Sequence, residues 1–172
     1  MEFQELILNR ESIRDYDPSR PVEPARLERI LESGRLAPSA ANRQPWTFIL
    51  VSSPEMLEKV RACYHKQWFK DAPHILIVAG DENASWIRSY DGYNSLETDL
   101  AIAMDHVVLA AENEGVGTCW IAAFDHSVLH KALSLKSSEK VFTITPLGYP
   151  HKGFVKKANK VRKELKDIVR YL

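Results

Sequence analysis

Hydrophobic residues recur along this chain at two spacings, one typical of helices and the other typical of short buried strands. Apolar positions three and four residues apart predict helices at 24–36, 54–63, 95–114 and 126–134. Short apolar runs rich in β-branched residues predict four strands, at 47–53, 74–81, 117–125 and 140–150. This mixture predicts an α+β domain with four strands and about five helices.

The longest predicted helix, 95–114, has an unusually apolar sequence. Its hydrophobic side chains follow helical spacing, at Leu96, Leu100, Met104, Val107, Val108 and Ala111. Gly115 stands where a left-handed residue commonly ends a helix. Because small residues occupy much of the remaining surface, we expect this helix to be buried on most sides, either centrally or at a contact between subunits.

Length, charge and cysteine content narrow the class of protein. At 172 residues the chain is expected to form one domain, residues 1–172, with its own core. Its 23 basic and 23 acidic residues cancel, which argues against nucleic acid or an anionic membrane as a partner. Two cysteines are too few for a disulfide framework. No segment has the pattern of a signal peptide or a membrane span, so we expect a cytoplasmic protein.

The sequence contains no motif for a catalytic side chain. The P-loop, GxGxxG and GxSxG patterns are absent. His126 and His130 are one helical turn apart, but without a third metal ligand they are more simply solvent-facing residues. Cys119 lies in an apolar run and is more simply a small core residue than a nucleophile. If the protein is an enzyme, a bound cofactor supplies its reactivity.

The stretch RESIR, residues 10–14, offers cationic groups close to the N-terminus. An extended backbone there would point Arg10, Ser12 and Arg14 in the same direction. Two guanidinium groups and a hydroxyl that converge suit a phosphate or another anion. The alternative is a pair of ordinary surface arginines.

The loop APSAANRQPW, residues 37–46, places amide side chains directly before the first predicted strand. The amides of Asn42 and Gln44 offer donors and acceptors together, which suits a planar heterocycle with alternating N–H and C=O groups. The alternative is that these side chains bond the backbone of their own loop.

Together these stretches resemble the nitroreductase family of FMN-dependent flavoproteins. The resemblance covers nearly the whole chain, through RESIRDY, LAPSAANRQPWTFILV, DLAIAMDHVVLAAENEGVGTCWIAAFD, LGYP and a terminal Lys-x-Arg. It implies a central mixed, mainly antiparallel β-sheet flanked by helices, in an intertwined homodimer. It also implies two FMN molecules at the dimer interface, each in a site that residues of both subunits complete.

The resemblance implies how one end of FMN is bound. The residues that match phosphate-binding positions are Arg10, Ser12, Lys160 and Arg162. Arg14 matches a basic residue beside the flavin pyrimidine edge, where a positive charge favours the reduced flavin. Many relatives have a basic or neutral residue at the position of Glu11. This chain therefore brings a carboxylate next to the phosphate site, and we expect its side chain to point away.

The resemblance also assigns residues around the flavin ring. Asn42 matches the amide that reads the pyrimidine edge, and the same loop supplies residues that frame the ring and the ribityl chain, namely Pro38, Ser39 and Gln44. Ala122 and Ala123 match positions whose backbone N–H groups face flavin N5 and O4.

The implied activity needs no catalytic side chain. NADH or NADPH delivers hydride to flavin N5 and leaves, and a nitroaromatic, a quinone or a related acceptor then occupies the same pocket in a ping-pong reaction. The segment 82–95 carries three aromatic residues, Trp86, Tyr90 and Tyr93. They either line the mouth of the substrate pocket or pack against the partner subunit. The alternatives are a flavin-storage or redox-sensing protein without turnover, or a specialised chemistry such as reductive dehalogenation or enoate reduction.

Overall fold

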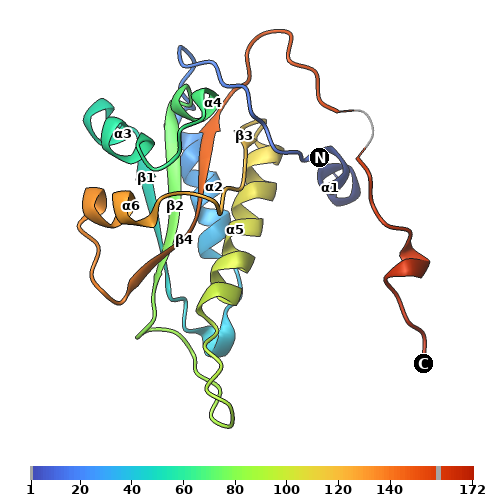
Figure 1. The fold of residues 1–172 in the computed structure, drawn as a ribbon. Helices are drawn as coiled ribbons and strands as arrows, with labels where there is room; N and C mark the ends of the chain where they lie inside the picture. Colours follow the sequence, from blue (N-terminus) through green and yellow to red (C-terminus); the bar gives the residue numbers. More distant parts are fainter. Residues whose placement is uncertain (1, 158–159) are drawn as a thin grey trace.

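The computed structural model describes residues 2–157 and 160–172, and its centre is a four-stranded antiparallel sheet between two layers of helices (Figure 1). The strands are β1 (Trp46–Val51), β2 (His74–Asp81), β3 (Gly117–Thr118) and β4 (Glu139–Gly148). They lie in the order β1-β2-β4-β3, and every neighbouring pair is antiparallel. The helices are α1 (Phe3–Asn9), α2 (Pro24–Arg35), α3 (Pro54–Arg61), α4 (Gln67–Lys70), α5 (Leu96–Asn113) and α6 (His126–Leu133). Single 3-10 turns occupy Ala40–Asn42 and Leu165–Asp167. The expected α+β class and mainly antiparallel sheet are confirmed.

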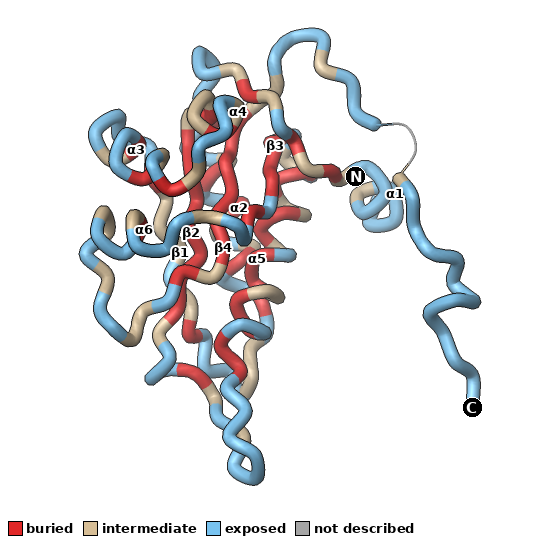
Figure 2. The backbone as a smooth tube through the Cα atoms, in the orientation of Figure 1, coloured by how far each residue is buried: buried red, intermediate tan, exposed pale blue. Residues whose placement is uncertain are grey.

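Strand β2 divides the core into two halves, because successive side chains of a strand point to opposite faces. Leu76 and Val78 join the cluster that contains α2 and α5. Ile75 and Ile77 join the cluster that contains α3 and α6. Figure 2 shows this central strand buried along its length. A strand covered on both faces needs apolar residues at consecutive positions, which explains the unbroken run HILIVAG.

Helix α5 is the central helix that its apolar sequence predicts. Nine of its residues are buried, and α2 packs along it. Gly34 permits this close approach, because a Cβ atom there would lie 2.7 Å from a methyl carbon of Val107. Gly115 has a φ of +72° directly after the helix, the left-handed conformation in which glycine commonly ends helices.

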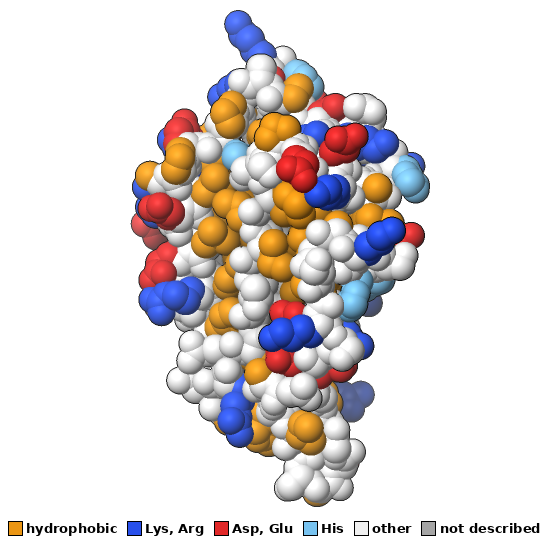
Figure 3. Space-filling model, turned by 90° about the vertical axis from the view of Figure 1, so that its left-hand side faces the viewer, with side chains coloured by type: hydrophobic (Ala, Val, Ile, Leu, Met, Phe, Trp, Pro, Cys, Tyr) orange, Lys and Arg blue, Asp and Glu red, His pale blue; other side chains and the backbone are white. Residues whose placement is uncertain are grey.

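The opposite face of the sheet carries shorter helices. Figure 3 shows this side, where hydrophobic side chains run along the middle of the surface between charged ones. Residues such as Ile49, Met56 and Val128 are only partly buried there. Helices of eight residues, α3 and α6, therefore cover this face less completely than α2 and α5 cover the other.

The predicted strand 117–125 is wrong over most of its length. Only Gly117–Thr118 is a strand, and Ile121 adds one isolated bridge to Ile144 of β4. Asp125 then accepts hydrogen bonds from the backbone of Ser127 and Val128 as the N-cap of α6, so the chain has already turned away from the sheet. Helices α1 and α4 did not emerge from the apolar spacing because both are very short.

Helix α1 and the C-terminal part of the chain lie on the same side of the sheet, and the C-terminus itself lies well beyond α1 (Figure 1). Helix α1 and the segment from residue 150 onward, which we call the C-terminal arm, extend from the main body. The arm exposes several large apolar side chains, among them Val161, Leu165, Ile168 and Tyr171. Among the described residues, no helix combines the length and apolar character needed to cross a membrane.

Candidate functional site

The segment 10–14 is extended and lies beside the short edge strand β3. Ser12 forms a parallel bridge with Thr118, and the N–H of Ile13 donates to the carbonyl of Thr118 at 2.8 Å. Glu11 and Ile13 are buried, whereas Arg10, Ser12 and Arg14 are partly or fully exposed. The alternation predicted from the sequence is therefore present, and the two arginines and the serine share one side of the segment.

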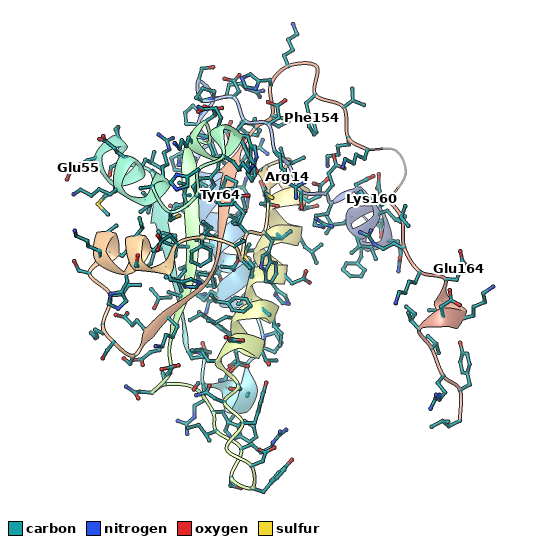
Figure 4. The ribbon with its side chains drawn as sticks, in the orientation of Figure 1. Arg14, Glu55, Tyr64, Phe154, Lys160 and Glu164 are labelled. Atoms are coloured by element: carbon teal, nitrogen blue, oxygen red, sulfur yellow. The ribbon has the colours of Figure 1, made fainter. Side chains whose placement is uncertain are left out.

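The C-terminal arm completes a pocket against this segment, and Figure 4 shows Lys160 of the arm on the same side of the sheet as Arg14. The Nζ atom of Lys160 donates to the carbonyl oxygen of Arg10 at 2.6 Å and also to that of Leu8. The pocket has a volume of about 320 Å³ and is lined by Arg10, Glu11, Ser12, Arg14, Lys157, Lys160, Val161 and Arg162. Residues from the two ends of the sequence thus form one small cavity.

The charges around this pocket are strongly unbalanced. Five cationic side chains line it, against the single carboxylate of Glu11. Within residues 2–157 and 160–172, Arg10, Arg14 and Arg162 form no ion pair. Partial burial lowers the pKa of the Lys160 amine, and the neighbouring Arg10 acts in the same direction. Unpaired cations that converge on one cavity favour an anion, and a phosphate group, with its high charge and three acceptor oxygens, fits this set of donors.

Cys119 lies directly behind the pocket. Its thiol interacts with the side chains of Ser12 and Arg14. Burial raises the pKa of this thiol, and the two neighbours only partly oppose the effect. A buried thiol kept protonated at neutral pH is a poor nucleophile, which agrees with a packing role for Cys119.

The loop 37–46 lies at the other end of α5. Its Ala40 N–H donates to the buried carboxylate of Asp99, in the first turn of that helix, at 2.8 Å. The segment 10–14 instead pairs with β3, which follows the last turn. Because a helix rises about 1.5 Å per residue, the loop and the pocket are separated by about 25 Å within one chain. Figure 1 shows the two segments at opposite ends of α5.

The backbone of this loop is strained. Ala41, Asn42 and Gln44 have φ values of 49°, 54° and 49°, in the left-handed region that residues other than glycine seldom adopt. Ser39 Oγ accepts the N–H of Gln44 at 2.9 Å, and the Gln44 amide donates to the Asn42 side chain at 3.1 Å. The loop therefore bonds part of its own polar groups, yet it leaves Asn42 and Gln44 exposed. Strain of this kind is commonly maintained at functional sites.

Ala122 and Ala123 lie on the pocket's side of the molecule. Ala122 is four residues beyond Thr118, so it lies within about 14 Å of the residue that pairs with Ser12. Both alanines are exposed, and their N–H groups donate no hydrogen bond within the described part of the chain. Two backbone donors are thus free to meet a ligand.

The residues predicted to contact substrate belong to a hairpin. Ile87 and Asn94 form its bridge, and at its tip the guanidinium of Arg88 lies 5.1 Å from the ring centre of Tyr90 and 4.7 Å from that of Tyr93. Arg88 also forms an ion pair with Asp91 at 2.6 Å. Tyr90 is 82% exposed, and Trp86 is half-buried at the base. The hairpin lies at the same end of α5 as the loop 37–46.

The structure thus groups the sequence-predicted residues into two sets. Those that converge in one pocket are Arg10, Ser12, Arg14, Lys160 and Arg162. The loop residues Pro38, Ser39, Asn42 and Gln44 and the aromatic hairpin lie at the far end of α5. Sequence reasoning missed Lys157, which lines the pocket, and Asp99, which holds the loop. The available signal for Asp99 was a carboxylate on the apolar face of α5, three residues after Leu96 and four before Ala103.

Comparisons with known proteins identify the family of this chain. A sequence model described as "Nitroreductase family" matches residues 7–70 and 56–149. The "Putative NADH dehydrogenase/NAD(P)H nitroreductase" of Archaeoglobus fulgidus is 32% identical over 154 residues, 87% of this chain and 86% of that protein. Iodotyrosine deiodinase 1 of Rattus norvegicus is 26% identical, covering 88% of this chain and 63% of that protein. A nitroreductase family protein from Clostridium difficile 630 has a crystal structure with a TM-score of 0.91 and 31% identity, covering 99% of this chain and 98% of that one. The chain therefore belongs to the nitroreductase family of oxidoreductases.

Proposed function

We propose that this protein is an FMN-dependent oxidoreductase that uses NADH or NADPH to reduce nitroaromatic, quinone or related acceptors. The observation that carries the proposal is the pocket between residues 10–14 and the C-terminal arm, where unpaired cations converge in a chain of this family. The name of the archaeal relative, which includes NAD(P)H nitroreductase, supports the choice of electron donor.

The residues of the pocket would hold the phosphate end of FMN. Arg10, Ser12, Lys160 and Arg162 supply charged and hydroxyl donors to its oxygens. Arg14, at the same cavity, would lie by the flavin pyrimidine edge, where a cation favours the negative charge that reduction brings. When bound, FMN supplies the redox chemistry, accepting hydride from the nicotinamide and passing electrons to the acceptor.

The free N–H groups of Ala122 and Ala123 would orient the ring. Each is exposed and without an intrachain acceptor among the described residues, so each is available to a ring nitrogen or carbonyl. Donors held by the backbone keep their direction better than flexible side chains do, and they bind without a large cost in side-chain entropy.

A homodimer would bring the two sets of residues together. Within one chain, about 25 Å of α5 separates the phosphate pocket from the loop that carries Asn42. In a symmetric dimer, the loop of one subunit lies next to the pocket of the other, so both sites form at once. The exposed apolar residues of the C-terminal arm give such an interface hydrophobic surface to bury.

The aromatic hairpin would accompany the loop into the partner's site. Ser95 Oγ accepts the N–H of Trp86 at 3.3 Å and donates to Asp99 at 2.8 Å, and Asp99 in turn accepts the N–H of Ala40. Because this chain of bonds joins the base of the hairpin to the loop, we expect Tyr90 and Tyr93 to line the substrate mouth.

The direct test is the colour of the purified protein. We expect a yellow protein whose visible absorbance disappears with NADH or NADPH in the absence of oxygen and returns with air. A colourless protein that does not take up added FMN would refute the cofactor assignment. A yellow protein that neither nucleotide reduces would favour storage or sensing. Reoxidation of the reduced protein by a nitroaromatic, a quinone and an iodinated phenol then identifies the acceptor class.

Arg14→Ala tests the assignment of one residue. Loss of the cation is expected to lower FMN retention or to make the bound flavin harder to reduce, because the negative charge gained on reduction is then less stabilised. Flavin titration and a redox titration measure the two effects. Arg20→Ala removes an exposed arginine that stacks on Tyr149 and does not line the pocket, and it serves as the control. Unchanged occupancy and potential in Arg14→Ala would remove this residue from the site.

A further inference from the structure

The two ends of the chain are joined along a short seam, which we define as residues 8–11 and 156–160 without the undescribed positions 158 and 159. The seam contacts run from Lys156 Nζ to the Asn9 carbonyl and the Glu112 carboxylate, from Lys157 N–H to the Glu11 carboxylate, and from Lys160 Nζ to the Leu8 and Arg10 carbonyls. Lys156 and Lys160 make their contacts with the end of a flexible side chain, whereas Lys157 makes its contact with its backbone N–H.

Glu11 makes the contact that differs from the others. Glu11 is only 8% exposed, and it lines the pocket together with Arg10, Ser12 and Arg14. Its two carboxylate oxygens lie 3.1 and 3.3 Å from the backbone nitrogen of Lys157. Among the described residues, this is the seam contact that holds the main chain of the arm. A main-chain contact determines the path of the backbone, whereas a lysine Nζ can keep its contact while the backbone moves.

Electrostatics alone would not favour a carboxylate at this position. Glu11 is the one acidic residue among the residues lining a pocket with five cations. A negative charge there weakens the attraction for a phosphate. The contact with Lys157 explains why a carboxylate is present. Glu11 accepts the N–H of Lys157 and so ties the arm to the segment 10–14.

We infer that Glu11 is a positioning residue that fixes the C-terminal arm over the pocket and thereby creates the preference for phosphorylated over unphosphorylated flavin. The inference rests on the proposed function. The carboxylate of Glu11 accepts the backbone N–H of Lys157. It holds the backbone of Lys157, in the same arm that supplies Lys160 and Arg162 to the pocket. The residues free to meet the flavin ring, Ala122 and Ala123, form no backbone hydrogen bond with the arm among the described residues.

The experiment compares the affinity of the apoprotein for FMN and for riboflavin, which lacks the phosphate. Loss of the acceptor in Glu11→Ala is expected to weaken FMN binding by roughly 10- to 100-fold, the range for one hydrogen bond to a charged group. Riboflavin affinity is expected to stay within about twofold, because the ring contacts are unchanged. Glu11→Gln keeps an acceptor oxygen and is expected to retain the wild-type ratio of the two affinities or to raise it.

The control is Glu5→Ala, which removes an exposed carboxylate of α1 that has no partner in the described part of the chain. Tighter or unchanged FMN binding in Glu11→Ala would mean that its charge, and not its position, matters, and would overturn the inference. Equal weakening of both flavins would overturn it as well. If Glu11→Ala does not fold, Glu11→Gln decides: a tenfold fall in its affinity ratio refutes the acceptor role, and a maintained ratio supports it.

Flavin binding by the wild-type protein distinguishes a failure of the role of Glu11 from a failure of the proposed function. A wild-type protein that binds neither flavin refutes the proposed function. A wild-type protein that prefers FMN, together with a Glu11→Ala variant of the same preference, refutes only the role of Glu11.

Discussion

Replacement of Asp99 by alanine is the sharpest test of how the loop 37–46 is held. Asp99 is 2% exposed at the start of α5 and accepts two hydrogen bonds, each of 2.8 Å. One comes from the N–H of Ala40 and the other from the hydroxyl of Ser95. The variant Asp99→Ala leaves both donors without this acceptor, at the point where the strained loop meets the helix.

The expected loss in the free energy of unfolding is about 2–4 kcal/mol. Each hydrogen bond to a charged group contributes about 1.5–3 kcal/mol. Ala40 is half-buried, so water replaces part of its bond, whereas Ser95 is buried and loses more. Removing a buried carboxylate also returns some desolvation energy, which reduces the total. A side chain of the same size with one acceptor, in Asp99→Asn, is expected to cost about 1–3 kcal/mol because its NH₂ group faces one of the donors.

Urea denaturation measures the global effect, and limited trypsin digestion measures the local one. Arg43 is exposed inside the loop and offers a cleavage site after its carbonyl. Without Asp99, the left-handed backbone of Ala41, Asn42 and Gln44 can relax, so cleavage at Arg43 is expected to become faster. Asp105→Ala is the matched control, because it removes an exposed aspartate from the same helix.

Two results together would refute the role of Asp99 in holding the loop. If Asp99→Ala unfolds within about 0.5 kcal/mol of Asp105→Ala, a typical surface effect, and if cleavage at Arg43 is also unchanged, then Asp99 does not hold the loop. Faster cleavage with unchanged global stability would instead mean that the loop opens independently of the core.

Two further predictions concern stability. Burial lowers the pKa of His74, whose Nε2 accepts the N–H of Val22 and whose Nδ1–H donates to Ser52. Since the unfolded imidazole is protonated first, this stabilisation is complete above about pH 6.5 and is lost as the pH falls below it. Thermal melts from pH 5 to 8 should therefore show a steeper decline for wild type than for His74→Gln. In Gly34→Ala, overpacking against Val107 and Phe48, about 1–3 kcal/mol, should exceed the gain in helix propensity of about 1 kcal/mol, so urea denaturation should show a net loss.

Results opposite to these two predictions would show which physical assumption is wrong. Equal pH dependence of wild type and His74→Gln would mean that His74 does not control the acid transition. His151, whose pKa Asp15 raises through a hydrogen bond, acts in the opposite direction, because its contribution grows as the pH falls. A more stable Gly34→Ala variant would mean that the side chains of α5 and β1 move aside at little cost.

Several helices and strands could be predicted from the sequence alone. The expected helix 24–36 is observed as Pro24–Arg35, and the expected strand 74–81 is observed with those limits. Apolar spacing determines these elements because each must present a continuous hydrophobic surface to the core. Alternation also placed Arg10, Ser12 and Arg14 on one side of an extended segment, since side-chain direction follows from backbone conformation.

The exact extent of the edge segments was not accessible in this way. The run 117–125 is as apolar as a strand, yet it pairs at only a few positions before the chain turns into α6. Edge pairing depends on which neighbour is present, and the apolar content of a run does not report that.

What only the tertiary structure decided is which polar groups meet. Glu11 and Lys157 are separated by 146 positions, yet they join the two ends of the chain at one pocket. Asn42 and Arg14 are far closer in sequence than Glu11 and Lys157, yet the loop and the segment that carry them lie at opposite ends of α5, about 25 Å apart within the chain. The physical reason is that spacing patterns report the local conformation of a segment, whereas convergence depends on how distant segments pack. The sequence by itself determined the elements and the kinds of ligand-binding groups, and the packing around α5 decided where those groups are presented.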